Sequence, residues 1–348
     1  MSHPYSDLPA RAFWRSAVAE TDRSQFPGLY TPRVAITPDT TVATAGSCFA
    51  QHIGTYLRMA GCNVQDAERP LQAMTDKIAK RFGYGLFSAR YGNIYTARQM
   101  CELLEDVRSG HVHDAHVWTK GNVFVDAFRP TIEPEGLETR EEVRLHRTHH
   151  LIRVAAMLER TDVFVFTLGL TECWQHIPTG RTYPVCPGVA GGIFDPGQHR
   201  FHNFTHAEVL ADLHRLHDLL RSFNPDMALI LTVSPVPLTA TATDAHVLNA
   251  TTQSKATLRA AAGEFIANTV NTDYVPSFEI ITAPASGGPW FDGNMRSVST
   301  AGVEKVMSIF LAAHGLIEAA PEATPTPQPD TAEEDLVCED LLLQSFAK

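Results

Sequence analysis

The chain has 348 residues, of which 44% are hydrophobic and 19% charged, so it is long enough to bury one large core or two ordinary ones. Its formal net charge of -11 gives no general attraction to phosphate backbones or anionic lipid, and no run of Lys and Arg supplies a local one. We therefore expect neither nucleic acid nor a membrane surface as a partner.

The N-terminal stretch MSHPYSDLPARAFWRSAVAE lacks the basic start, the apolar stretch and the small-residue cleavage site of a secretory signal. No apolar run approaches the roughly 20 residues of a membrane span. The six cysteines show no CxxC pair and no regular spacing, which is typical of reduced thiols. We expect a cytoplasmic protein without a zinc site or a disulfide framework, and we assign no metal and no cofactor.

Short β-branched runs alternate with longer helical patterns, as in a parallel sheet with crossover helices, so the predicted fold class is α/β. Residues 172–204 follow neither pattern and are rich in Gly, Pro and His, which is typical of a binding or lid loop. Strands are predicted over residues 42–45, 162–169, 227–233 and, from a weaker pattern, 274–280, and helices over 48–60, 206–223, 253–268 and 300–314.

The same patterns divide the chain into one domain with extensions. We expect an N-terminal extension over residues 1–29 and a single α/β domain over 30–317. A Pro-rich linker is predicted over 318–332, because this composition cannot bury enough apolar surface to order itself. Residues 333–348 have the apolar spacing of a short amphipathic helix. This helix either docks on its own domain or binds a protein partner.

Ser47 lies where the first predicted strand stops and the first helix begins. That position is at the carboxyl edge of a parallel sheet, where open α/β proteins bind ligands and where N–H groups can stabilise an oxyanion. A serine there is more simply explained as a helix N-cap. The neighbouring Cys48 offers a thiol nucleophile as a further alternative.

The residues around Ser47 carry a family resemblance. Residues 46–50 read GSCFA, and the surrounding TAGSCFAQHIGTYL resembles the opening block of the GSCFA family. The resemblance continues, in order, through YGLFSARYGNIYT (84–96), TLGLTECW (167–174), YPVCPG (183–188) and SPVP (234–237). The family is held to be related to the SGNH (GDSL-like) hydrolases. This relation implies a three-layer flavodoxin-like fold with a central parallel sheet, and ester hydrolysis or acyl transfer as the activity.

The resemblance also implies roles for single residues. The serine of the first SGNH block corresponds to Ser47. A glycine of the second block corresponds to Gly92, with Asn93 as an amide donor, so that these residues and the Ser47 N–H would form the oxyanion hole. A Gly-Asn pair is equally an ordinary turn. The third block, usually Gly-x-Asn-Asp, here contains Thr171, which offers only a hydroxyl, and Glu172, either a general acid/base or a salt-bridged carboxylate.

The last block departs from the pattern. SGNH enzymes carry Asp-x-x-His before the final helix, whereas this chain has Asn294 and Ser297 at those positions and Asp292 two residues earlier. Loss of the base normally costs orders of magnitude in rate. Three explanations are open: Asp292 or Glu172 serves as the base, a histidine from elsewhere does, or the protein binds without catalysing.

Sixteen histidines offer replacements, and His176, His199, His202 and His206 lie in or beside the irregular segment. Two histidine clusters, at 111–116 and 146–150, mimic metal ligation but lack a second half with ligand spacing. Arg90 and Arg296 could hold an anionic substrate group in a bidentate fork, or pair with internal carboxylates.

These inferences lead to one preferred function and one alternative. The preferred function is a serine-dependent ester hydrolase or O-acyltransferase acting on an acylated, carbohydrate-like substrate. The alternative is a catalytically silent SGNH-like module that binds a glycan or a protein segment. The predicted catalytic residues are Ser47, Asp292 and Glu172, and the predicted oxyanion or substrate-binding residues are Gly92, Asn93, Thr171, Arg90 and Arg296.

Overall fold

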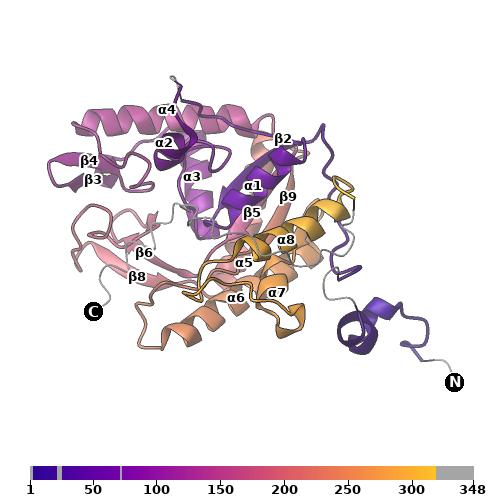
Figure 1. The fold of residues 1–348 in the computed structure, drawn as a ribbon. Helices are drawn as coiled ribbons and strands as arrows, with labels where there is room; N and C mark the ends of the chain where they lie inside the picture. Colours follow the sequence, from indigo (N-terminus) through magenta and orange to yellow (C-terminus); the bar gives the residue numbers. More distant parts are fainter. Residues whose placement is uncertain (1–2, 22–25, 71–72, 319–348) are drawn as a thin grey trace.

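The computed structural model describes residues 3–21, 26–70 and 73–318 (Figure 1). The predicted C-terminal helix (333–348) and all but the first residue of the predicted linker (318–332) lie outside these residues. Within the predicted N-terminal extension, two short helical turns are present, η1 (Ala10–Ala12) and η2 (Arg15–Ala19).

Five parallel strands form the central sheet, in the order β10-β9-β5-β1-β2. Numbered along the chain within this sheet, the order is 2-1-3-4-5, which is the flavodoxin-like order. The predicted α/β class and flavodoxin-like fold are therefore confirmed. The strands are β1 (Thr41–Gly46), β2 (Asn63–Val64), β5 (Val163–Leu168), β9 (Ala228–Val233) and β10 (Thr272–Val275).

Helices cover both faces of the sheet, which makes three layers (Figure 1). Four helices contribute to the core on one face: α3 (Ala97–Ser109), α4 (Arg140–Leu158), α5 (His206–Phe223) and α6 (Val247–Asn268). Three contribute to the core on the other face: α1 (Ala50–Met59), α7 (Ser277–Thr282) and α8 (Thr300–Ala313).

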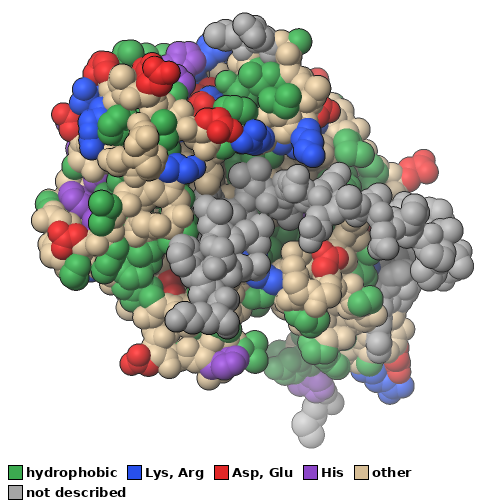
Figure 2. Space-filling model, turned by 60° about the vertical axis from the view of Figure 1, so that its left-hand side comes forward, with side chains coloured by type: hydrophobic (Ala, Val, Ile, Leu, Met, Phe, Trp, Pro, Cys, Tyr) green, Lys and Arg blue, Asp and Glu red, His purple; other side chains and the backbone are tan. Residues whose placement is uncertain are grey.

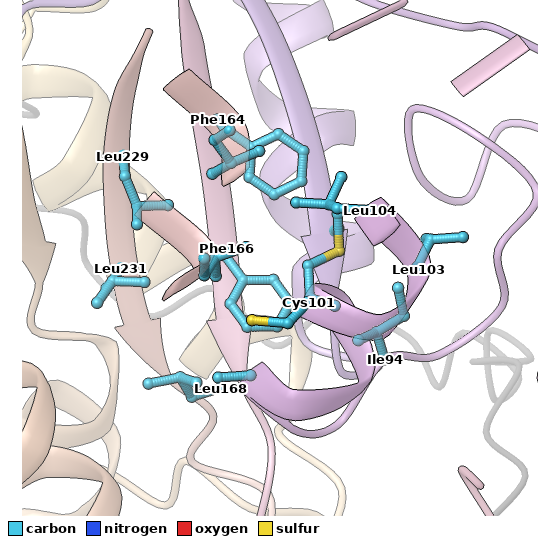
Figure 3. Close-up of a cluster of buried hydrophobic side chains, with 14 of the residues drawn as sticks. Ile94, Cys101, Leu103, Leu104, Phe164, Phe166, Leu168, Leu229 and Leu231 are labelled. Atoms are coloured by element: carbon cyan, nitrogen blue, oxygen red, sulfur yellow. The ribbon is translucent and has the colours of Figure 1, made fainter. Parts of the chain in front are cut away.

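Strand β5 shows why the sequence selects this arrangement. All six of its residues are buried, as expected for a central strand with helices on both faces. Phe164, Phe166 and Leu168 alternate onto one face, where they pack with Cys101 and Leu104 of α3 (Figure 3). Val163 and Val165, which alternate with them, belong to the core on the other face. The side-chain period of two thus fills both cores from a single strand.

Two predictions need correction. The predicted strand over 274–280 ends at Val275, because Pro276 cannot donate to a sheet ladder, and the following residues form α7. Residues 172–204 are not an irregular loop throughout. They contain three short antiparallel strands: β6 (Glu172–His176), β7 (Thr182–Tyr183) and β8 (His199–Asn203).

Several elements were not predicted. Both α3 and α4 begin with capping boxes, at Thr96 with Gln99 and at Thr139 with Glu142, so a sequence signal for each helix start was present. Other elements that were not predicted are β2, α2 (Asp76–Arg81), η3 (Asp114–His116), the hairpin of β3 (Val117–Lys120) and β4 (Val123–Asp126), and η4 (Pro284–Ser286).

The surface mixes charges of both signs. Over the described part of the face in Figure 2, Lys and Arg side chains lie among Asp and Glu side chains. No helix within the described ranges has the length and apolar character that crossing a bilayer requires.

Candidate functional site

The carboxyl ends of β1 and β5 meet where the strand order of the sheet reverses, the place where such folds bind ligands. Ser47 follows β1, and Gly169 follows β5. The Ile94 N–H donates to the Gly46 carbonyl at 2.9 Å, and the Gly169 N–H donates to the Tyr95 carbonyl at 2.8 Å. The segment before α3 therefore bridges the two strand ends, and three of the blocks that carry the family resemblance lie together.

Two glycines allow this close approach. Gly46 has a φ of 136°, and a Cβ atom there would lie 2.4 Å from the Thr167 carbonyl oxygen. A Cβ atom on Gly169 would lie 2.9 Å from Tyr95 Cδ1 and 3.1 Å from Ser47 Cβ. Both positions thus exclude a larger residue, so the glycines shape the surroundings of Ser47.

Ser47 is 2% exposed, and its hydroxyl has no hydrogen-bond partner among the described residues. The N-cap of α1 is Phe49, and no side chain caps this helix end. The alternative that Ser47 is a helix N-cap is therefore wrong. A buried hydroxyl that makes no hydrogen bond is costly, which is typical of a group kept for binding or reaction.

The predicted oxyanion donors differ in their surroundings. The Ser47 N–H donates to the Thr167 carbonyl at 3.1 Å, so it is engaged within the fold. Gly92 has a φ of 68°, and both it and Asn93 are buried. They directly precede Ile94, the residue that bonds to the end of β1. Their position suits a role beside Ser47, and that role stays a prediction.

Thr171 and Glu172 of the third block make their side-chain hydrogen bonds with other parts of the chain. Thr171 donates its hydroxyl proton to Asn203 Oδ1 at 2.6 Å. The Glu172 carboxylate accepts a hydrogen bond from the Thr241 hydroxyl at 2.7 Å. Both side chains are therefore held by neighbouring elements, β8 and the loop after β9.

The last block forms an exposed turn closed by its own hydrogen bonds. The Asp292 N–H donates to the Ser297 carbonyl, and Asn294 Oδ1 accepts the N–H groups of Arg296 and Ser297, each at 2.9 Å. The Asp292 residue is exposed, and Arg296 is half-buried. The hydrogen bonds of the Asp292 turn (292–297) therefore do not bring a carboxylate to Ser47.

Arg90 lies within the second block but is surrounded by protein. Its guanidinium pairs with Glu133 at 2.7 Å, donates to the Phe82 carbonyl at 2.8 Å and stacks over the Tyr84 ring at 4.0 Å. These contacts match the alternative of an internal carboxylate pair.

Two histidines in or beside residues 172–204 have hydrogen-bond partners other than Ser47. His202 lies 2.9 Å from Glu208, and His176 lies 2.9 Å from Thr179, so they stabilise the local sheet and helix start. No His, Asp or Glu of the described ranges forms a hydrogen bond with the Ser47 hydroxyl. Within the same ranges, no group of three or more His, Cys, Asp or Glu side chains is placed to hold a metal ion.

Sequence reasoning missed one charged residue at this edge. Lys255 of α6 is 2% exposed, and its Nζ group donates to the Gly169 carbonyl. Three residues before Leu258 and seven before Ala262, it shares their buried helix face. A lysine in an apolar stripe was therefore a readable signal in the sequence.

We compared the chain with known proteins. No curated protein matches the chain. Among solved structures, a GDSL-like lipase from Parabacteroides merdae is similar at 13% identity and a TM-score of 0.36, over 82% of this chain and 100% of that one. A carbohydrate esterase family 3 protein from Talaromyces cellulolyticus is similar at 10% identity and a TM-score of 0.33, over 78% and 94%. Both scores are low, so the fold assignment rests on the strand order of this chain.

The family comparison covers most of the chain. The model of the GSCFA family matches residues 41–310, from the start of β1 to within α8. This range contains the whole central sheet and every block quoted above. The chain belongs to the GSCFA family.

Proposed function

We propose that this protein is a serine-dependent ester hydrolase or O-acyltransferase that acts on an acylated, carbohydrate-like substrate, with Ser47 as the nucleophile. The observation that carries the proposal is the Ser47 hydroxyl, which is buried at the strand-order reversal and makes no hydrogen bond to any described residue. A buried hydroxyl without a hydrogen bond is costly, and this one lies at the edge where such folds bind ligands. Both facts support a reactive role for Ser47.

In this function, Ser47 Oγ attacks the acyl carbon and forms an acyl-serine as the alcohol leaves. Water then completes hydrolysis, or an acceptor hydroxyl completes transfer. Gly92 N–H and the Asn93 amide are the proposed donors to the oxyanion, since they lie beside the residue that bonds to the end of β1. The carbohydrate-like substrate rests on the relation of the family to SGNH hydrolases.

One observation favours a second candidate function. No carboxylate or imidazole of the described residues forms a hydrogen bond with Ser47 Oγ, and the Asp292 turn is closed by its own hydrogen bonds. A catalytically silent module that binds a glycan or a protein segment needs no base. The two functions differ in whether Ser47 forms a covalent bond.

The test compares wild type with Ser47→Ala on a chromogenic acetyl ester and on an acetylated sugar, over pH 5–9. We expect the variant to lose about 10³-fold or more of the hydrolysis rate, because the nucleophile is removed. Ser222→Ala is the control, since its hydroxyl donates to a carbonyl near the end of α5, and it should change the rate less than about twofold. Equal rates in wild type and Ser47→Ala would contradict the proposal and favour the binding module.

A further inference from the structure

Lys255 lies in an unusual place for a lysine. It belongs to the third turn of α6, on the face that the helix turns towards the sheet, and only 2% of the residue is exposed. Lysines are almost never fully buried unless they have a partner. Its side chain reaches the Gly169 carbonyl, to which the Nζ group donates a hydrogen bond.

Gly169, the residue after β5, also lies against the nucleophile. A Cβ atom on this glycine would be 3.1 Å from Ser47 Cβ, so its backbone packs directly against the serine. The preceding residue of α6, Ser254, accepts the Thr171 N–H at 2.9 Å. Two successive residues of α6 thus hold the chain just after β5, and Lys255 Nζ bonds to the same residue whose backbone packs against Ser47.

From this juxtaposition we infer that Lys255 is the base that activates Ser47, in the role that the missing histidine of the last block would have had. The inference rests on the proposed function and adds a catalytic residue to it. Serine nucleophiles paired with lysine bases occur on unrelated folds, and buried lysines serve as general bases. A neutral amine keeps two N–H groups and one lone pair, so it can donate to the Gly169 carbonyl and still accept a proton. The Ser47 hydroxyl makes no hydrogen bond with Lys255 in the structure, so in this inference the proton reaches Nζ through one water.

The proton balance closes with this single group. Neutral Lys255 Nζ takes the Ser47 Oγ proton as Oγ bonds to the acyl carbon. The ammonium then gives that proton to the departing alkoxide as the ester C–O bond breaks, which leaves the acyl-serine and the free alcohol. In the second half, water or an acceptor hydroxyl gives its proton to Nζ and attacks the acyl carbon, and Ser47 Oγ leaves and recovers the proton.

The experiment replaces Lys255 in the full chain with Arg and with Met. Arginine keeps the positive charge but cannot be deprotonated, so it separates a base from a cation that only stabilises the oxyanion. The readouts are the labelling rate of Ser47 by a fluorophosphonate, followed by intact mass, and acetyl-ester hydrolysis, both over pH 6–10. Lys305→Met is the matched control, because Lys305 is also buried but lies 5.6 Å from the Phe26 ring in the N-terminal segment.

If Lys255 is the base, both Lys255 variants lower labelling and hydrolysis at least about 100-fold, while Lys305→Met stays within about threefold of wild type. If Lys255→Arg keeps more than a tenth of the wild-type rate, Lys255 is not the base, and its role is that of a cation that stabilises the oxyanion. A Lys255→Met rate equal to wild type would overturn any role.

Wild-type measurements keep the inference testable where a variant unfolds, as judged by its thermal midpoint. A wild-type labelling rate that falls as the pH rises from 6 to 10 contradicts an amine that must be neutral to act. A wild type that neither labels at Ser47 nor hydrolyses any ester removes the proposed function together with the base, which is a different result from an active wild type with active Lys255 variants.

Discussion

The two halves of the expected catalytic site are built very differently in this protein. At the end of β1, the serine is buried, its neighbours are glycines, and its hydroxyl makes no hydrogen bond to described residues. At the Asp292 turn (292–297), the carboxylate residue is exposed and the amide of Asn294 satisfies the backbone of the turn itself. One region keeps a buried hydroxyl without a hydrogen bond to described residues, and the other is a turn before α8 closed by its own hydrogen bonds.

This difference shows which part of the expected site depends on the packing of the central sheet. The surroundings of Ser47 depend on the close approach of β1, β5 and the segment before α3, so they persist as long as the sheet does. The Asp292 turn lies at the end of a loop, where a substitution changes little else. The proposed base, Lys255, accordingly comes from α6 and not from the Asp292 turn.

The largest expected effect beyond the Ser47 and Lys255 variants comes from Gly46→Ala. The new Cβ atom would lie 2.4 Å from the Thr167 carbonyl oxygen, at a φ of 136°, so β1 and β5 cannot keep their spacing. We expect a loss of about 3 kcal/mol in the free energy of unfolding, together with the loss of esterase activity. Urea unfolding and the chromogenic assay measure both.

Gly61→Ala is the matched control for this variant. Gly61 also has a positive φ, of 81°, but no atom lies within 4 Å of its added Cβ. Its substitution should cost only the conformational strain, about 1 kcal/mol. Equal losses in the two variants would show that close approach to Thr167 does not shape the Ser47 region.

A smaller effect is expected in the pH dependence of stability. It tests whether a buried histidine takes the place of the histidine that the last block lacks. His150 is fully buried, and its Nδ1 atom lies 2.7 Å from Glu68. Burial, assisted by the charge of Arg129, lowers the pKa of His150 from 6.5 to about 4. Between these two values the unfolded chain binds a proton that the folded protein does not, so this stability is present above pH 6.5 and is lost as the pH falls towards 4.

We expect the free energy of unfolding to fall by about 2 kcal/mol from this group between pH 7 and pH 5. His150→Gln should flatten that dependence in urea titrations while leaving the pH profile of ester hydrolysis unchanged. A shifted activity profile in this variant would instead make His150 part of the catalytic machinery.

The smallest expected effect is that of Asp292→Asn. This residue is exposed, and the backbone hydrogen bonds of its turn do not depend on its carboxylate. The hydrolysis rate should stay within about threefold of wild type, and the free energy of unfolding within about 0.5 kcal/mol. A loss of 100-fold would break the comparison between the two regions, because it would make Asp292 the base.

Sequence patterns were sufficient for the central elements. The apolar run of β5, the GSCFA block after β1 and the helical spacing of α5 and α8 all correspond to elements of the structure. These segments are long and periodic, so local propensity and burial agree. Shorter strands were missed between Glu172 and Asn203, because strands of two to five residues with many polar side chains have little periodic signal.

The candidate site was only partly readable. Ser47 was found from its place after a strand and from the family resemblance, and the missing histidine was visible in the last block. Lys255 was not singled out, although a lysine on the buried stripe of a predicted helix marked it as unusual. Glu172 was considered as a base, and its bond to Thr241 comes from a loop about 70 residues later, which no local pattern reveals.

The sequence by itself determined the family, the α/β class and the position of Ser47 at the edge of the sheet, because these depend on local patterns and on turn chemistry. Only the tertiary structure decided which side chains share that edge. The hydrogen-bond partners of Gly169 are Tyr95 and Lys255, one earlier and one later in the chain. Such contacts form because crossover helices pack on the parallel strands, and they cannot be predicted from the distance between the residues along the chain.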